Sequence, residues 1–400
     1  MSLKKFTTPV TKSVAKYVSK QVLKSVAAGL FGVTAIHAVT ATAGTFVYVS
    51  NADDGDISSY VLSPDMKLTT GPRVPAAKLV MPMVASADGH FLYASVRSKP
   101  FSVYTYAVDQ KTGLLKWQSA SPLPDSMVHM TLDKTGRWLL SASYGGGSLS
   151  VHAVDAQGRV ASEPTRFLPS GGVKPHSIKI DLANRYVYVP HLGTDEIKTY
   201  AFDASTGQLN AQNSTSTKLP KDFGPRHFVF SNDGKFLYLL GEMSGHVAVF
   251  ERQANTGELK QIQSLSSIPS DSTLLPGVPR LPVGTPGALD FDETKVIWSA
   301  DIQMTPNGRF LYTTERTQNN LSRFAINQVT GKLEFLGQTP TEKQPRGFAI
   351  DSQGNYLIAS GEKSNTISLY ILDGNTGALT LKEKAPVGNG ANWVQIIQTP

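Results

Sequence analysis

Short stretches of alternating hydrophobic and polar residues recur along the chain from residue 44 to its end. Each is followed by a turn of the type Asp/Asn-x-Gly and by a second, aromatic-rich stretch, as in SNDGKFLYLLGE and TPNGRFLYTTER. A period of two, bounded by Gly, Asn and Asp, is typical of half-buried antiparallel strands. The pattern therefore predicts an all-β protein after the first forty residues.

Seven copies of this pattern can be aligned on one position of the second strand. Successive copies lie 45 to 50 residues apart, except for one interval of 74 residues. Each copy continues into a third and a fourth alternating strand, and a spacing of about 40 to 50 residues is typical of a four-stranded propeller blade. We therefore expect a seven-bladed β-propeller of four-stranded antiparallel blades over residues 44–400. The aligned positions are Tyr48, Tyr93, Leu140, Tyr188, Tyr238, Tyr312 and Ile358.

The two ends of the repeat region complement each other. The first copy has no innermost strand before Gly44, whereas the chain ends with an extra strand in NWVQIIQTP, from Asn392 to Gln398. An unpaired strand at each end would leave open sheet edges. We expect the C-terminal strand to complete the blade that the N-terminal strand begins, which closes the ring.

The first 43 residues have the composition of a cleavable export signal. They hold a lysine-bearing start, the apolar stretch VAAGLFGVTAIHAV, and Ala41-Thr42-Ala43, which has the small-x-small pattern of a cleavage site. The apolar stretch is short and interrupted for a membrane anchor. We expect cleavage after Ala43, export to the periplasm, and no stable membrane anchor afterwards.

The basic charge of the chain is concentrated in this leader. The formal net charge is +7, and it falls to +1 without the six lysines that precede residue 44. The charge of the propeller therefore gives no electrostatic reason to expect a nucleic-acid partner. The chain has no cysteine, which excludes a thiol nucleophile, a disulfide and a thiolate metal site. No motif of a serine hydrolase, a zinc protease or a nucleotide-binding loop is present. We expect no cofactor and no metal, and the oligomeric state is unknown from the sequence.

Strand direction brings a set of polar residues together at one face of the predicted propeller. In an antiparallel blade, residues just before the first strand meet residues just after the second. Several arginines, a carboxylate and a histidine in such a mouth suit an anionic small molecule or a developing oxyanion. The residues in these positions are Arg97, Tyr144, His176, His191, Arg226, Glu242, Asp301, Glu315, Arg316, Arg346, Glu362 and Lys363.

Three segments carry a family resemblance: GPRHFVFSNDGKFLYLLGEMSGHVAVFE, SADIQMTPNGRFLYTTER and QPRGFAIDSQGNYLIASGEKSNTISLY. They resemble the seven-bladed bacterial 6-phosphogluconolactonases and the related fungal carboxy-cis,cis-muconate lactonizing enzymes. The resemblance extends from about Thr45 to Trp393. It implies a catalytic set of a histidine, two arginines and a glutamate, which match His176, Arg226, Glu242 and Arg316. Arg97, Tyr144, Asp301 and Arg346 are expected to bind substrate.

The expected activity is hydrolysis of a sugar lactone by a carboxylic-ester hydrolase. Either Glu242 or His176 would deprotonate water, while Arg226 and Arg316 would hold the oxyanion or a substrate anion. The alternatives are a lactonizing isomerase of the carboxymuconate type and a non-catalytic, ligand-binding or interaction propeller. The partner is a small lactone or another anionic sugar derivative. Export would favour glucono-1,5-lactone over its 6-phosphate.

The interval of 74 residues contains a Pro-rich insertion near residues 267–298. It lies between the outer strand of one blade and the inner strand of the next, so strand direction places it on the same face as Arg226 and Glu242. Its prolines restrict the flexibility of the segment. We expect a semi-ordered lid over the mouth, with Arg280 and Asp290 as contacts; the alternative is a surface loop without function.

Overall fold

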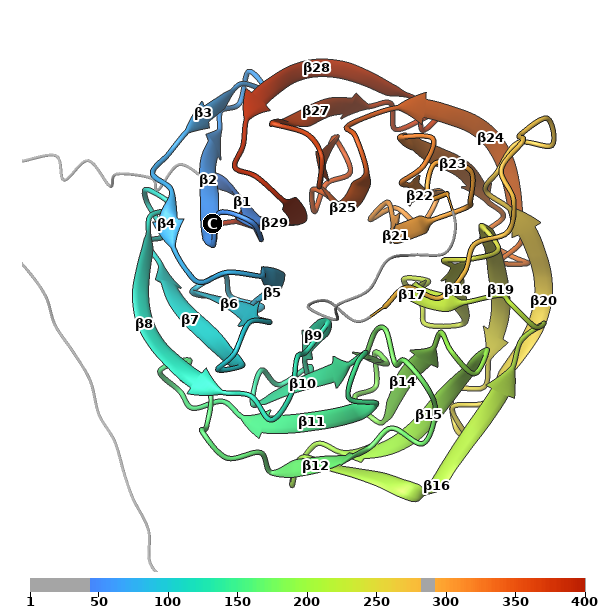
Figure 1. Cartoon of the computed structure of the whole chain (residues 1–400), viewed down its shortest axis with the longest axis horizontal. Helices are drawn as coiled ribbons and strands as arrows, with labels where there is room; N and C mark the ends of the chain where they lie inside the picture. Colours follow the sequence, from blue (N-terminus) through green and yellow to red (C-terminus); the bar gives the residue numbers. More distant parts are fainter. Residues whose placement is uncertain (1–43, 282–291, 400) are drawn as a thin grey trace, which may run out of the picture. The chain divides into compact units, whose positions relative to one another are not determined.

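The computed structural model describes residues 44–281 and 292–399. The export signal expected over residues 1–43, with its cleavage after Ala43, lies outside the described residues. Within the described ranges, no helix is long and apolar enough to cross a membrane. The described residues fold into seven antiparallel sheets arranged as the blades of a propeller (Figure 1). This architecture confirms the all-β, seven-bladed prediction.

Each blade pairs its strands in the order in which they follow along the chain, except where the two chain ends meet. The first four blades consist of β29 (Ala391–Gln398), β1 (Thr45–Asn51), β2 (Asp56–Leu62), β3 (Leu68–Thr70) and β4 (Val74–Pro75); β5 (Val80–Ala85), β6 (Phe91–Val96), β7 (Ser102–Val108) and β8 (Leu115–Pro122); β9 (His129–Leu132), β10 (Trp138–Ser143), β11 (Ser148–Ala153) and β12 (Arg166–Pro169); and β13 (Lys179–Ile180), β14 (Tyr186–His191), β15 (Glu196–Asp203) and β16 (Gln208–Lys218).

The remaining three blades follow the same order from the innermost to the outermost strand. They consist of β17 (Pro225–Phe230), β18 (Phe236–Gly241), β19 (His246–Arg252) and β20 (Leu259–Ser266); β21 (Ser299–Met304), β22 (Phe310–Glu315), β23 (Asn320–Ile326) and β24 (Leu333–Pro340); and β25 (Pro345–Ile350), β26 (Tyr356–Gly361), β27 (Thr366–Leu372) and β28 (Leu379–Pro386). In Figure 1 the first strands surround the centre and the fourth strands form the rim.

The ring is closed by the two ends of the repeat region, as predicted. Strand β29 pairs antiparallel with β1, from Thr45 opposite Gln398 to Asn51 opposite Ala391. Val49 and Tyr60 of this blade pack with Ile358 of the preceding blade in one hydrophobic cluster. The closing blade is therefore joined to its neighbour by the same kind of apolar packing as any other pair of blades.

The aligned tyrosines of the second strands connect neighbouring blades. The Tyr48 hydroxyl donates to the carbonyl of Gly113 at 2.7 Å, and the Tyr188 hydroxyl donates to that of Gly257 at 2.9 Å. In each case the acceptor lies in the Thr-Gly turn between the third and fourth strands of the next blade. A buried tyrosine thus supplies apolar contact area and satisfies a turn carbonyl, which explains its recurrence in the repeat.

Candidate active site

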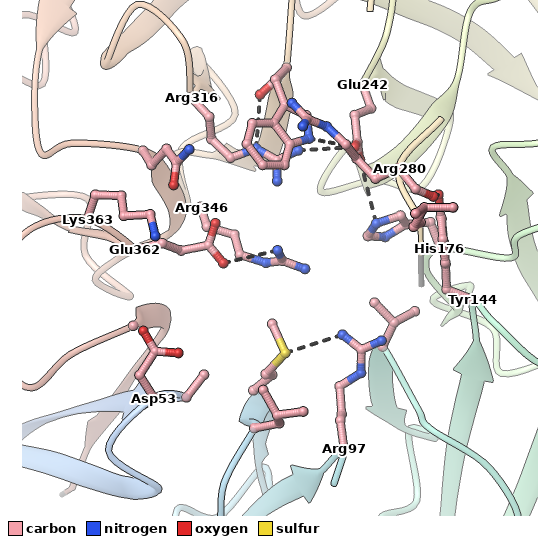
Figure 2. Close-up of a pocket in the computed structure, with 18 of the residues that line it drawn as sticks. Asp53, Arg97, Tyr144, His176, Glu242, Arg280, Arg316, Arg346, Glu362 and Lys363 are labelled. Carbon is pink, nitrogen blue, oxygen red and sulfur yellow. Dashed lines mark hydrogen bonds and ion pairs between the residues drawn. The ribbon is translucent and has the colours of Figure 1, made fainter. Parts of the chain in front are cut away.

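A cavity of about 440 Å³ lies where the inner strands begin and the second strands end. We call it the mouth cavity (Figure 2). Its position confirms the strand-direction argument, because residues from several blades meet there. The residues expected at the mouth that line this cavity are Arg97, Tyr144, His176, Glu242, Arg316, Arg346, Glu362 and Lys363.

One β-hairpin places Arg226 beside Glu242. Arg226 lies in β17 and Glu242 directly follows β18, and Pro225 stands opposite Gly241 in the pairing of these strands. Arg226 Nε donates to Glu242 Oε2 at 2.7 Å. Both side chains are buried, with 1% and 5% of their surfaces exposed. The hairpin therefore forms a buried ion pair at the base of the mouth cavity.

Two further donors hold the other oxygen of Glu242. Trp298 Nε1 donates to Glu242 Oε1 at 2.8 Å, and Arg316 Nη2 lies 3.2 Å from the same oxygen. Burial would raise the pKa of Glu242, but the charges of Arg316 and Arg226 hold that pKa below its ordinary value. Glu242 is therefore an ionised carboxylate near neutral pH, with most of its acceptor capacity in use.

Trp298 is a site residue that the sequence reasoning did not identify. Its ring lies between two guanidinium groups, with Arg280 Cζ at 3.3 Å and Arg316 Cζ at 3.8 Å from the ring centroid. Stacking on an aromatic face orients a guanidinium and lowers the cost of removing it from water. One signal was available in the sequence: Trp298 directly precedes an inner strand, β21, and such positions face the mouth.

His176 lies next to the carboxylate on the cavity wall. Its Nε2 is 3.6 Å from Glu242 Oε2, and its ring packs edge-on against Tyr144 with centroids 5.3 Å apart. Burial and the nearby charge of Arg226 lower the pKa of His176 well below its ordinary value. The imidazole is therefore neutral at pH 7, and one of its nitrogens carries a free lone pair.

Arg316 completes this group. It directly follows β22, and it donates from Nε to the Trp298 carbonyl at 3.0 Å and from Nη2 to the Ser299 carbonyl at 3.1 Å. Burial lowers the pKa of Arg316 to about 9, although the carboxylate of Glu242 opposes this effect. The guanidinium is thus a cation fixed at the cavity wall by backbone acceptors.

Arg226 lies behind the mouth cavity and not in its wall. Its Nε is occupied by Glu242, and its Nη1 donates to the carbonyl of Ala300. Arg226 instead borders a small void with His227 and Arg346, beneath the mouth cavity. Arg226 was expected to hold the oxyanion, but the structure places it behind the cavity wall. From there its side chain orients Glu242.

Asp301 also differs from the expectation that it contacts substrate at the mouth. It faces a second cavity of about 270 Å³, which includes Lys179 and residues further along the inner strands. His227 Nδ1 lies 2.9 Å from Asp301 Oδ1. The reason is a register shift in β21 between Ser299 and Ile302, since such a bulge changes the direction in which a side chain points.

His191 and Glu315, expected at the mouth from strand position, do not line the mouth cavity either. Glu315 accepts hydrogen bonds at Oε1 from the backbone N–H of Trp298, at 2.7 Å, and at Oε2 from that of Gln318. It thus fixes the loop that carries the tryptophan. His191 is buried at the end of β14 and paired opposite Glu196 in the strand register.

The described parts of the Pro-rich insertion border the mouth cavity. Arg280 and Glu293 line it and form an ion pair with Nη1 and Oε1 3.0 Å apart. The Arg280 carbonyl accepts hydrogen bonds from the Tyr144 hydroxyl at 2.9 Å and from Lys174 Nζ at 3.2 Å. Asp290, the other expected contact, lies outside the described residues. The lid remains a prediction.

Arg346 and Arg97 form the opposite part of the wall (Figure 2). Arg346 Nη1 lies 3.1 Å from Glu362 Oε1. Arg97 donates from Nε to Ser126 Oγ and from Nη1 to Met81 Sδ, each at 3.2 Å. Over residues 44–281 and 292–399, no group of three or more His, Asp and Glu side chains is arranged to hold a metal ion. The mouth cavity thus combines one clamped carboxylate, a neutral histidine and several cations.

Comparison with known proteins agrees with this architecture. The chain matches the family model described as lactonase, 7-bladed β-propeller, over residues 46–396. It is 36% identical over 351 residues to the 6-phosphogluconolactonase of Pectobacterium carotovorum, covering 88% of this chain and 98% of that protein. The 6-phosphogluconolactonase of Serratia proteamaculans is 35% identical with the same coverage. The solved structure of the periplasmic gluconolactonase of Pseudomonas aeruginosa superposes with a TM-score of 0.75 at 23% identity, over 90% of this chain and 100% of that one. This chain therefore belongs to the family of seven-bladed β-propeller lactonases.

Proposed function

We propose that this protein hydrolyses the lactone of a sugar acid. Two observations support the proposal: the relatives that cover most of the chain are named 6-phosphogluconolactonase, and the mouth cavity holds groups suited to lactone opening. The observation that carries it is the arrangement of neutral His176 3.6 Å from a carboxylate, Glu242, that three donors hold in place. A neutral imidazole beside a fixed anion is a suitable general base.

In the proposed reaction, water attacks the lactone carbonyl carbon. His176 accepts the proton from that water while the carbonyl oxygen gains negative charge. The bond from the carbonyl carbon to the ring oxygen then breaks, and the protonated His176 returns its proton to the ring oxygen as it leaves. The product is the open-chain sugar acid, and every proton is accounted for.

Glu242 serves in this proposal as the anion that stabilises protonated His176. Both of its oxygens are engaged by Arg226, Trp298 and Arg316, which leaves the carboxylate little capacity to accept a proton from water. Nε2 of His176 is the nitrogen that faces it, so a proton on Nε2 is stabilised by the carboxylate at 3.6 Å. The sequence left open which of the two residues is the base; the contacts of Glu242 favour His176.

Arg316 is the proposed partner of the oxyanion. Its guanidinium lines the mouth cavity next to His176 and Glu242, and backbone carbonyls and the Trp298 ring fix its position. A fixed cation aimed at developing charge stabilises a transition state without rearrangement. Arg226 contributes through Glu242, since it lies behind the wall.

The substrate and the compartment are linked in this proposal. The two candidate substrates, 6-phosphogluconolactone and glucono-1,5-lactone, differ only by the phosphate group. We propose export of the chain with loss of residues 1–43, on the composition of the leader. Mass spectrometry of the protein from a periplasmic extract tests this: a mature chain that begins at Gly44 is expected, and an intact N-terminus in the cytoplasm would contradict it.

Proton release during hydrolysis tests the proposed function. The purified protein is mixed in weak buffer with 6-phosphogluconolactone, glucono-1,5-lactone or a carboxymuconolactone, and the acid formed is titrated. We expect hydrolysis of at least one sugar lactone far above its spontaneous rate, with His176→Gln lowering turnover about 100-fold or more. The matched control is His191→Gln, another buried histidine that does not line the mouth cavity. A folded protein that hydrolyses neither sugar lactone would refute the proposal.

A further inference from the structure

One of the four arginines that line the mouth cavity differs from the other three in its partners. Arg316 is paired with Glu242 at 3.2 Å, Arg346 with Glu362 at 3.1 Å, and Arg280 with Glu293 at 3.0 Å. Arg97 has no such pair: among the described residues, no carboxylate oxygen lies within 4.0 Å of its guanidinium. Its side-chain partners are a hydroxyl, that of Ser126, and a thioether, that of Met81.

Arg97 is nevertheless buried. Only 5% of the residue is exposed, and its position is fixed because it directly follows β6 and donates its backbone N–H to the Leu79 carbonyl at 3.1 Å. Removing a guanidinium from water without a counter-ion is strongly unfavourable. Burial and the like charge of Arg346 lower its pKa to about 9, so the group is still a cation at neutral pH.

The guanidinium points into the mouth cavity from the side opposite Glu242 and Arg316, with Arg346 between them (Figure 2). The thioether of Met81 is a weak acceptor and does not neutralise a charge. Arg97 and Arg346 thus present adjacent positive charge to the cavity, and only Arg346 has an anionic partner in the protein. Arginine binds planar or tetrahedral oxyanions with two parallel hydrogen bonds, which a buried and fixed position favours.

We propose that Arg97 is an anion-binding subsite for an acidic group that the substrate carries away from its lactone carbonyl. This inference rests on the proposed lactonase function and specifies its substrate class: an acidic sugar lactone, with a phosphate ester or a carboxylate at the far end. The lactone carbonyl reacts at the side of the mouth cavity that His176 and Arg316 line. The acidic group at the other end of the substrate supplies the counter-ion that Arg97 lacks. Arg97 therefore determines specificity and takes no part in bond breaking.

Three lactones separate the two sources of the anion. 6-Phosphogluconolactone carries a terminal phosphate, a glucarolactone carries a terminal carboxylate, and glucono-1,5-lactone carries neither. We expect Arg97→Gln to lower kcat/KM for the preferred acidic lactone by about 10- to 100-fold, as loss of a charge-assisted hydrogen bond would. The value for glucono-1,5-lactone is expected to change less than about 3-fold. The kcat/KM of Arg97→Lys for the acidic lactone is expected to lie between those of wild type and Arg97→Gln. Lysine keeps the positive charge but lacks the two parallel N–H donors of the guanidinium.

Binding of the products provides a readout that does not depend on activity. Calorimetry with 6-phosphogluconate, glucarate and gluconate is expected to show tighter binding of one of the first two to the wild type, and loss of that preference in Arg97→Gln. Without ligand, Arg97→Gln is expected to unfold at the wild-type temperature or above, because an unpaired buried charge has been removed. Arg159→Gln, which removes the same charge from an exposed site, is the control.

Two results would overturn the subsite. An equal fall in kcat/KM for charged and uncharged lactones would place Arg97 at the reacting carbonyl. Equal binding of gluconate and of the two products that carry a second anion, in wild type and in Arg97→Gln, would show that Arg97 binds no second anion. Failure of the proposed function has a different signature, since the wild type would then hydrolyse none of the three lactones while the binding experiment still tests the subsite.

Discussion

Arg226 and Glu242 form a buried ion pair, with Nε and Oε2 2.7 Å apart, at the base of the mouth cavity. The pair spans a single β-hairpin, from β17 to the end of β18. Glu242 also pairs with Arg316 and accepts a hydrogen bond from Trp298. One carboxylate is thus the shared partner of two buried guanidinium groups, and the site depends on it for both stability and geometry.

Replacement of Glu242 is expected to destabilise the fold. Glu242→Gln leaves Arg226 and Arg316 buried without their counter-ion, and breaking such a pair costs about 3–5 kcal/mol. Urea unfolding measures the change in free energy. The control is Glu196→Gln, since Glu196 is also buried but pairs with Lys218, whose side chain is 67% exposed. Equal losses in the two variants would contradict a special role for the buried cluster.

The pH dependence of turnover reports on His176. Its pKa is well below 6.5, because burial and Arg226 disfavour the protonated form. The proposed base is therefore already neutral at pH 6.5, and kcat/KM is expected to be constant from there to about pH 8. Activity should fall only under more acidic conditions, as His176 becomes protonated. A profile that rises on acidification would show that a protonated group is required instead.

Trp298→Phe isolates the indole hydrogen bond to Glu242. The substitution keeps an aromatic ring between Arg280 and Arg316 but removes the donor that lies 2.8 Å from Glu242 Oε1. A hydrogen bond to a charged group contributes about 1.5–3 kcal/mol. We expect kcat to fall about 10- to 100-fold and KM to change little. A change in KM alone would indicate that Trp298 contacts substrate and does not orient the carboxylate.

Stability is expected to decrease as the pH falls below 6.5. Burial lowers the pKa of five buried histidines: to about 4 for His191, well below 6.5 for His129, His176 and His227, and below its ordinary value for His152. The unfolded chain then binds more protons than the folded one, and each such histidine contributes about 1.4 kcal/mol per pH unit in this window.

Two carboxyls oppose this trend, because burial raises the pKa of Asp301 and of Glu315. Five histidines against two carboxyls still give a net loss of stability on acidification. Urea unfolding at pH 5 and pH 7 measures this loss. His191→Gln should reduce the pH dependence of the free energy of unfolding by the contribution of about one proton. A free energy of unfolding that is the same at both values would contradict the neutral state of these histidines.

Ring closure by β29 is expected to be essential for folding. Removal of residues 391–400 would expose one edge of β1 along its whole length and uncover the apolar residues that pack on Val394. Unpaired edges favour aggregation. We expect the truncated chain to be insoluble, or to unfold at much lower urea concentration than the full chain. A truncated chain with wild-type stability would show that the ring does not depend on this strand.

The repeat pattern was sufficient to predict the fold, because each blade has the same local rules. Period-two alternation defines strands, and the unmatched strand at the C-terminus could pair only with the open edge of β1. Arg226 and Glu242 were predictable for a related reason. They lie 16 residues apart, on either side of one hairpin whose turn the sequence shows clearly.

The cavity that each polar side chain faces could not be predicted in this way. The inner strands β5, β17, β21 and β25 each have a register shift near their start, and period-two alternation contains no information on such bulges. For this reason Asp301 lies in the second cavity and Arg226 lies behind the wall. Trp298 was missed because an aromatic residue beside a strand is typical of core packing.

The most direct test of the account compares lactone hydrolysis by the purified protein, by Glu242→Gln and by Glu196→Gln, each confirmed to be folded. We predict proton release from 6-phosphogluconolactone or glucono-1,5-lactone by the wild type and by Glu196→Gln, and a turnover at least about 100-fold lower in Glu242→Gln. Equal turnover in all three proteins would show that the chemistry takes place away from the mouth cavity and would contradict the account.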